Sequence, residues 1–161
     1  MPWEKPYHPS RNQRLAPEQY TYANRVYFIT IRAYLHQSPF VRANLNRLVL
    51  DTLREEQPRQ ECRIFTYCLM PDHLHYLVSP GREGISVLQF TDRYKGRATN
   101  GSWTVGWRGK LWQPRCFEHI VRSEEDLGTI ADYILNNPVR KGLCPTVGEW
   151  PWAGCMNPLP W

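Results

Sequence analysis

Apolar and polar residues alternate along several short segments of this 161-residue chain, which is the pattern of half-buried β-strands. The strands expected from this alternation are residues 22–34, 62–70, 73–78 and 111–122. Other segments place apolar residues three and four positions apart, the spacing of an amphipathic helix. The helices expected from this spacing are residues 39–56, 84–98 and 123–137. Residues 99–110 are rich in glycine, which favours a loop.

The order of these elements predicts the fold class. Strand, helix, strand, strand, helix, strand is the split βαβ arrangement. We therefore expect an α+β fold, a ferredoxin-like sandwich in which an antiparallel sheet carries helices on one face and the helix at 123–137 follows the last strand. Residues 20–161 are expected to form one domain. Residues 1–19 contain four prolines and several charges, and are expected to form an extended N-terminal arm.

The strand at 73–78 carries two histidines. Because side chains alternate between the faces of a strand, His73, His75 and Leu77 share one face. Two residues along a strand span roughly 7 Å, so both imidazoles can converge on one metal ion. Imidazole is the commonest side-chain metal ligand, although taken alone the pair is as compatible with chance as with a metal site.

The helix at 123–137 carries a tyrosine and an amide on one face. Ser123 is the expected N-cap, Glu124 and its acidic neighbours fill the first turn, and a proline ends the helix. Tyr133 and Asn137 are four residues apart and therefore neighbours on the helix surface, where both could face a cleft. Considered alone, the segment favours a simpler interpretation, in which Tyr133 packs in the core and Asn137 caps the helix.

Taken together, these segments resemble a known family. The sequence Met-Pro-Asp-His-Leu-His at 70–75 and the sequence Asp-Tyr-Ile-Leu-Asn-Asn-Pro-Val-Arg at 132–140 are similar to motifs of the single-tyrosine HUH transposases, which are IS200-like. The closest resemblance is to the REP-associated tyrosine transposases of bacteria. Further matching segments are 93–99, 111–115, 118–122 and 150–154, in the same order and at the same spacing.

This resemblance implies an enzyme that nicks and rejoins single-stranded DNA folded into hairpins. By the resemblance, His73, His75 and Asn137 hold a divalent metal, and Tyr133 is the catalytic nucleophile that forms a 5′-phosphotyrosine. The Asn-Pro sequence favours the REP-associated branch, because related insertion-sequence enzymes tend to have glutamine at that place. Two imidazoles and one amide suit Mg²⁺ or Mn²⁺ better than Zn²⁺, whose structural sites are closed by four ligands.

Charge and aromatic content are consistent with a nucleic-acid partner. The formal net charge is +5, and seven Trp and nine Tyr could supply surfaces on which unpaired bases stack. Weaker candidates for DNA contact, which could equally be ordinary surface charge or core packing, are Arg93, Lys95, Arg97, Arg108, Lys110, Trp112, Arg115, Arg122 and Arg140. Lys95 and Arg97 rank above the others because they match family positions.

The remaining features concern compartment and competing functions. The five cysteines form no Cys-x-x-Cys pair and are interpreted as reduced, and Cys62 and Cys68 are expected on one face of their strand. Without a secretory signal or an apolar run of membrane-spanning length, we expect a cytoplasmic bacterial protein, monomeric or homodimeric, that associates with the nucleoid when bound to DNA. Three alternatives stay open: a hairpin-binding regulator without cleavage, a metal-dependent phosphodiester hydrolase, and an RNA-binding module.

Overall fold

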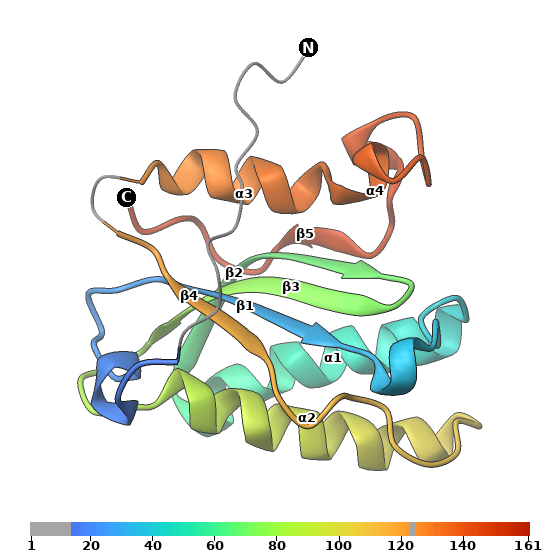
Figure 1. Ribbon diagram of the computed structural model, residues 1–161, viewed down its shortest axis with the longest axis horizontal. Helices are drawn as coiled ribbons and strands as arrows, with labels where there is room; N and C mark the ends of the chain where they lie inside the picture. Colours follow the sequence, from blue (N-terminus) through green and yellow to red (C-terminus); the bar gives the residue numbers. More distant parts are fainter. Residues whose placement is uncertain (1–13, 123–124) are drawn as a thin grey trace.

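The chain folds around one antiparallel sheet, shown in Figure 1. The structure is a computed structural model that describes residues 14–122 and 125–161. The sheet has five strands in the order β4-β1-β3-β2-β5. Their bounds are β1 Tyr27–Arg32, β2 Cys62–Met70, β3 His73–Pro80, β4 Phe117–Ile120 and β5 Ala153–Cys155. The first four strands have the ferredoxin-like order, which confirms the expected α+β fold.

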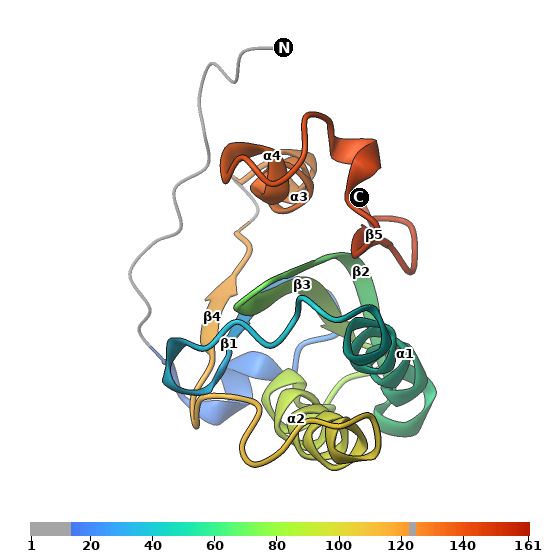
Figure 2. The same ribbon diagram turned by 90° about the vertical axis from the view of Figure 1, so that its right-hand side faces the viewer.

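Helices cover both faces of the sheet, as the end-on view in Figure 2 shows. The long helices α1, Ala43–Gln60, and α2, Val87–Thr104, pack side by side on one face. The tyrosine helix α3, Leu127–Leu135, lies across the other face and continues into the short α4, Asn137–Arg140. The last strand, β5, follows these helices and pairs with the outer edge of β2. The tyrosine helix therefore follows β4, and the short fifth strand is an element that the sequence did not indicate.

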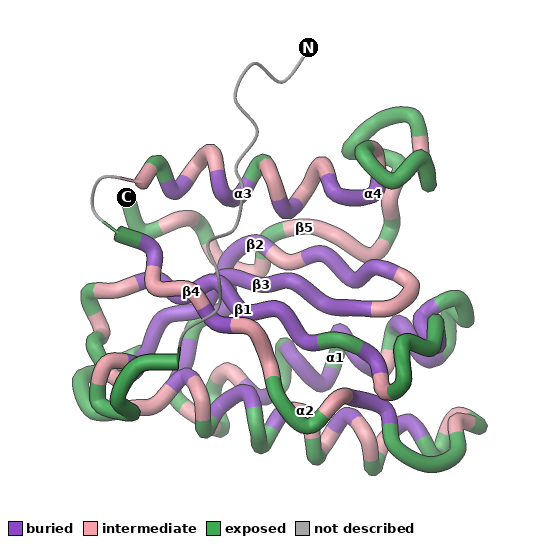
Figure 3. Tube along the Cα trace, viewed as in Figure 1, coloured by how far each residue is buried: buried purple, intermediate pink, exposed green. Residues whose placement is uncertain are grey.

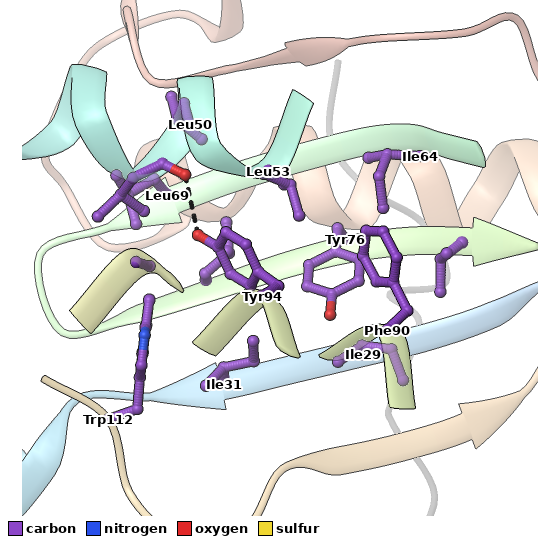
Figure 4. Close-up of a cluster of buried hydrophobic side chains, with 14 of the residues drawn as sticks. Ile29, Ile31, Leu50, Leu53, Ile64, Leu69, Tyr76, Phe90, Tyr94 and Trp112 are labelled. Carbon is purple, nitrogen blue, oxygen red and sulfur yellow. Dashed lines mark hydrogen bonds between the residues drawn. The ribbon is translucent and has the colours of Figure 1, made fainter. Parts of the chain in front are cut away.

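The larger core lies between the sheet and the α1–α2 layer. Figure 4 shows this cluster, in which Ile29, Ile31 and Tyr76 of the strands meet Phe90 and Tyr94 of α2. The Tyr94 hydroxyl donates to the Val49 carbonyl of α1 at 2.9 Å, so that the buried phenol has a partner. Burial of this apolar surface is the main force that holds the α1–α2 layer to the sheet.

A second core lies between the sheet and α3. Phe28, Leu77 and Cys68 of the strands pack against Ile130 and Ile134 of the helix. Because both faces of the sheet are covered, β1, β2 and β3 are buried along most of their length (Figure 3). Side chains on the α3 face can therefore be polar only where they meet other polar groups or a cleft.

Several boundaries differ from those expected. The α2 helix runs to Thr104, so residues 99–104 are helical and not part of a loop, because buried Ser102 extends the packed face of the helix by one turn. The strand expected at 111–122 is reduced to β4, preceded by a single bridge between Ala33 and Trp112. Helix α3 begins at Leu127, where the Asp126 carboxylate caps the Gly128 N–H. Ser123, the expected N-cap, and Glu124, expected in the first turn, lie outside the described residues.

One prediction about the cysteines is wrong. A register shift between Ile64 and Tyr67, where β2 bulges against β3, reverses the alternation of faces along β2. As a result Cys62 packs in the core under α1 and α2, whereas Cys68 packs in the core under α3. An interruption of this kind leaves no sign in the spacing of apolar residues.

The expected N-terminal arm is described only from Arg14. The Arg14 guanidinium pairs with the buried Glu118 carboxylate of β4 at 2.6 Å. Residues Pro17–Tyr20 form a single 3-10 turn against α2, and the Tyr20 ring is buried. Residues 1–13 lie outside the described residues. None of the helices formed by residues 14–122 and 125–161 combines the length and the apolar character needed to cross a lipid bilayer.

The two glycines inside α2 give a test of its extent. Gly96 is exposed and a Cβ there would meet no atom within 4 Å, whereas a Cβ on Gly101 would lie 3.0 Å from Leu48 Cδ2 of α1. Because alanine favours a helix over glycine, Gly96→Ala should raise the free energy of unfolding by about 0.5–1 kcal/mol, as measured by urea denaturation. Gly101→Ala should raise the free energy of unfolding by less. A larger increase for Gly101→Ala than for Gly96→Ala would contradict the packing of this turn against α1.

Candidate active site

The two histidines of β3 face α3, and their rings meet at one point. His73 and His75 share a face of the central strand, and both are buried, with 7% and 8% of their surface exposed. The pleat places the rings edge to face, so that the two Nε2 atoms are 3.0 Å apart. Two ligand atoms about 2.1 Å from one ion and at right angles to each other would also be about 3.0 Å apart. The spacing of the Nε2 atoms therefore fits one metal ion.

The other ring nitrogens are held by neighbours. Nδ1 of His73 is 2.6 Å from the Asp72 carboxylate, and Nδ1 of His75 is 2.7 Å from the Thr30 hydroxyl. An N–H at Nδ1 of each ring can donate to these oxygens, which leaves the lone pair of each Nε2 free to coordinate a metal. Hydrogen-bonded partners of this kind orient metal-binding histidines and fix their tautomers.

Burial keeps both imidazoles neutral. It lowers the pKa of His73, although the Asp72 carboxylate acts in the opposite direction. It lowers the pKa of His75 further, and the positive charge of Arg32 adds to the effect. A neutral imidazole is the form that binds metal, so the site does not have to lose protons at neutral pH before an ion can bind.

A break between two helices brings Asn137 to the same point. Helix α3 ends at Leu135, and Pro138 lies in the first turn of α4, where its missing N–H costs nothing. Asn137 is only 4% exposed, and its amide nitrogen is 3.2 Å from His73 Nε2. Rotation of the amide by a half turn exchanges its nitrogen and oxygen, so the oxygen can take this place as a metal ligand.

The amide of Asn137 is the candidate for the third ligand. The part of the chain that the structure describes contains no group of three or more His, Cys, Asp or Glu side chains that could hold a metal ion. Two imidazole nitrogens and one amide oxygen would leave room on a bound cation for water and phosphate oxygens, a donor set that suits Mg²⁺ or Mn²⁺. The residues present therefore fit the expected cation.

Tyr133 lies one helical turn before Asn137 and lines the same cleft. Its ring packs edge-on against Phe28, with ring centroids 6.4 Å apart. The Arg140 guanidinium lies 3.9 Å from the centroid of the Tyr133 ring and donates to the Tyr133 carbonyl at 2.8 Å. The tyrosine is therefore held from both sides, and Arg140 adds a positive charge beside the ring.

The cleft has a volume of about 660 Å³. His73, His75, Asn137 and Tyr133 all line it. Arg32 and Lys141 line it as well, and no carboxylate other than that of Asp72 is among the described side chains around it. A cleft with two neutral imidazoles, a tyrosine and a cationic wall is suited to a phosphodiester, whose negative charge the cations attract.

The chain matches a known protein family. Residues 21–137 match the model of the family described as "Transposase IS200 like". The matched range includes both histidines, the tyrosine and the asparagine. The chain belongs to the IS200-like transposase family. The match covers well over half of the chain and ends at the last candidate ligand.

Curated relatives of this transposase family carry the same kind of name. A Haemophilus influenzae protein assigned to the REP-associated tyrosine transposases is 31% identical over 110 residues, 59% of this chain and 62% of the relative. The REP-associated tyrosine transposase of Escherichia coli K12 is 28% identical over 92 residues, 56% of this chain and 52% of the relative. These relatives are named as transposases, which are enzymes, and the chain matches between half and two thirds of their length.

Solved structures show the same fold. A REP-associated tyrosine transposase bound to a REP hairpin superposes with a TM-score of 0.73 at 22% identity, over 90% of this chain and 82% of that chain. A Deinococcus radiodurans protein assigned as a transposase gives a TM-score of 0.55 at 21% identity, over 71% of this chain and 92% of the other.

The weaker predicted DNA contacts divide into two groups in this structure. Arg93, Lys95 and Arg97 project from α2, on the face of the sheet opposite the cleft, where they bind Gln60, the Gln113 carbonyl and Glu56 respectively. These contacts hold α2 to neighbouring segments. The second group consists of exposed basic residues outside α2. One of them, Arg140, lies beside Tyr133. The other exposed members are Arg108, Lys110, Arg115 and Arg122.

Trp112 requires a correction. Its ring is only 5% exposed and packs between Phe40 and Tyr94 in the core. It is therefore not available to stack on a base in this structure. Trp112 forms the bridge to Ala33, and its large ring packs in the apolar cluster under β1.

Several residues at the site were missed by sequence reasoning. Asp72 directly precedes His73, and this adjacency was the available signal for its role. Thr30 and Arg32 lie opposite His75 and His73 in the pairing of β1 with β3. That register depends on contacts between distant segments, and so the sequence offered no comparable signal for either residue. Lys141 is close to Asn137 in sequence, but it faces the cleft only because α4 ends there.

Removal of the ligands should remove the metal. His73→Ala and His75→Ala should each lower Mn²⁺ affinity by about a hundredfold or more, since even outer-shell changes cost about 10–100-fold. Asn137→Ala should have a smaller effect, because a neutral amide is the weakest of the three ligands. Isothermal titration calorimetry measures all three. His36→Ala, which removes an exposed histidine outside the cleft lining, is the control, and unchanged affinity in all three ligand variants would refute the site.

Proposed function

We propose that this chain is a metal-dependent endonuclease and strand transferase that acts on single-stranded DNA folded into hairpins. The observation that carries the proposal is the meeting of Tyr133 with His73, His75 and Asn137 in one cleft. A nucleophile and a set of metal ligands from different elements have no structural need to share a cleft. Family membership supports the reaction class, and the relative of similar fold solved with a REP hairpin supports the choice of substrate.

The side chains would divide the reaction as follows. His73, His75 and Asn137 would hold a divalent cation, which when bound neutralises charge on the phosphoryl oxygens and polarises phosphorus. Arg32 and Lys141 would attract the phosphate into the cleft through their charge. Phe28 and Arg140 would hold the Tyr133 ring in place, so that its oxygen is presented to the phosphorus.

The covalent step exchanges one phosphodiester bond for another. The Tyr133 hydroxyl gives up its proton to water as its oxygen attacks phosphorus. The bond from phosphorus to the 3′ oxygen breaks, and that oxygen takes up a proton from water and leaves as a free 3′-hydroxyl. The 5′ phosphate is then esterified to Tyr133. Because one phosphodiester replaces another, a 3′-hydroxyl can attack the phosphotyrosine and rejoin a strand without an external energy source.

The nucleophile is tested by removal of one oxygen. Tyr133→Phe keeps the ring and its packing, so it should leave DNA binding nearly unchanged while lowering Mn²⁺-dependent cleavage by more than about a thousandfold. The assay is a denaturing gel that resolves cleaved oligonucleotide from protein-linked oligonucleotide.

Tyr22→Phe is the matched control for this experiment. Tyr22 also has an arginine over its ring, with Arg25 4.3 Å from the centroid, but it lies outside the cleft lining. The Tyr22→Phe variant should cleave DNA at the wild-type rate. Full cleavage by Tyr133→Phe would mean that water or another side chain attacks the phosphorus.

The charge of the cleft predicts the salt dependence of binding. A hairpin with a single-stranded flank should bind more tightly than a fully paired duplex, and binding should weaken steeply as salt rises. Arg32→Gln should reduce the log–log slope against salt by about one, since each neutralised phosphate contributes roughly 0.7–0.9.

Arg54→Gln is the control for this measurement, because Arg54 is equally cationic but lies on α1, away from the cleft. Fluorescence anisotropy titrations at several salt concentrations give the slopes. Equal affinity for duplex and flanked hairpin, or equal slopes for the two variants, would argue for general DNA binding.

A further inference from the structure

The turn between β1 and α1 displays an apolar side chain on a strained backbone. Leu35 and His36 both have positive φ, +52° and +54°, and the Gln37 N–H donates to the Tyr34 carbonyl at 3.2 Å. Positive φ at both central residues is the mark of a type I′ turn, in which glycine, asparagine and aspartate are the usual residues. Leu35 is nevertheless 66% exposed. Neither the positive φ of Leu35 nor the exposure of its side chain to solvent stabilises the folded chain. We therefore infer that this residue contributes to binding.

The turn is fixed relative to the histidines. The Ala33 N–H donates to the Asp72 carbonyl at 2.8 Å, and the Phe40 N–H donates to the Pro71 carbonyl at 3.0 Å. Both ends of the loop are thus tied to the tight turn that leads into His73. Ser38, inside the same loop, lines the cleft. These contacts therefore fix the position of Leu35 relative to the cleft that contains Tyr133.

The surface beside the turn is basic and aromatic. The Tyr34 N–H donates to the Leu111 carbonyl, so the segment that links α2 to β4 passes the turn, at the end of the molecule that faces the viewer in Figure 2. Lys110 Nζ lies 5.2 Å from the centroid of the Tyr34 ring, and Arg42 lies 5.8 Å from that of Trp107. Residues 33–42 and 103–115 contain no aspartate or glutamate. This surface, called the basic end below, has the charge expected of a site for a phosphate backbone.

We propose that Leu35 packs against the terminal base pair of a hairpin stem, with the stem backbone on the basic end and the single-stranded flank passing Ser38 into the cleft. The last base pair of a stem exposes a flat apolar face, and apolar side chains pack against such faces when proteins grip the ends or kinks of duplexes. Because the turn is tied to Pro71 and Asp72, Leu35 sets the number of unpaired nucleotides between stem and cleavage position. The inference rests on the proposed function for its substrate and adds a residue that determines specificity.

The test separates the side chain from the backbone. Asparagine and glycine tolerate positive φ, so Leu35→Asn and Leu35→Gly should keep or raise the melting temperature while removing the apolar contact. Binding is measured in EDTA, where no cleavage occurs, with two probes: a pool of DNA hairpins with randomised 5′ flanks, and the same randomised flank without a stem. Both variants should bind the hairpin pool about tenfold more weakly, a loss expected for one buried leucine, and the free flank as tightly as wild type.

Leu15→Asn is the matched control, since Leu15 is 49% exposed and lies next to the 3-10 turn that packs on α2. It should bind both probes as wild type does. A 2-aminopurine base in the terminal pair should change its fluorescence with the wild-type protein and not with Leu35→Asn. Unchanged hairpin affinity in both Leu35 variants would overturn the proposal, as would an equal loss for hairpin and free flank.

Failure of this inference can be told apart from failure of the proposed function. Wild-type protein that forms no covalent adduct with either probe in Mn²⁺ would contradict the nuclease and leave the binding result for Leu35 standing. Adduct formation with normal stem binding by both Leu35 variants would contradict only the role of Leu35.

Discussion

The contact between the two imidazoles depends on the position of β3 at the centre of the sheet. Pairing with β1 on one side and β2 on the other fixes its pleat, and the pleat directs His73 and His75 to the same face at an Nε2–Nε2 distance of 3.0 Å. A strand at the edge could twist or slip, and a slip of one residue would turn both rings into the opposite core. The candidate metal site is therefore stabilised by the whole hydrogen-bonded ladder.

The tyrosine depends on a second constraint, the end of α3. The apolar stripe of this helix binds the α3 face of the sheet, with Ile130 and Ile134 against Phe28 and Leu77. This packing carries the helix across the sheet to the end that bears the histidines. Pro138 then stops the helix, and the break turns the buried Asn137 toward His73. Sheet and helix thus each supply part of a site that neither could form alone.

The parts of the site that the sequence predicted are those determined by local periodicity. The shared face of the two histidines follows from a period of two, and the shared face of Tyr133 and Asn137 follows from a period near four. The roles of Thr30 and Arg32 could not be predicted in this way, because they depend on how β1 is aligned with β3. Asp72 lay beside a predicted ligand, but whether its carboxylate would reach Nδ1 depends on the turn geometry.

The fold shows the same division. The order of strands and helices was predictable because each element has a clear period, and the ferredoxin-like order of the first four strands follows from it. The bulge in β2 was not predictable from the sequence, and it places Cys62 and Cys68 on opposite faces of the sheet. The last turn of α2 has a glycine, Gly101, that favours a loop by composition, yet packing against Leu48 keeps it helical. Tertiary contacts decide such cases over local preference.

The most direct test of Tyr133 as the nucleophile is to find the covalent link itself. Protein incubated with Mn²⁺ and a hairpin pool with randomised flanks is digested with protease and nuclease, and tandem mass spectrometry locates the residual nucleotide. A 5′-linked nucleotide is expected on Tyr133 and on no other tyrosine. A nucleotide on a different residue, or cleaved DNA without any linked peptide, would contradict this role of Tyr133.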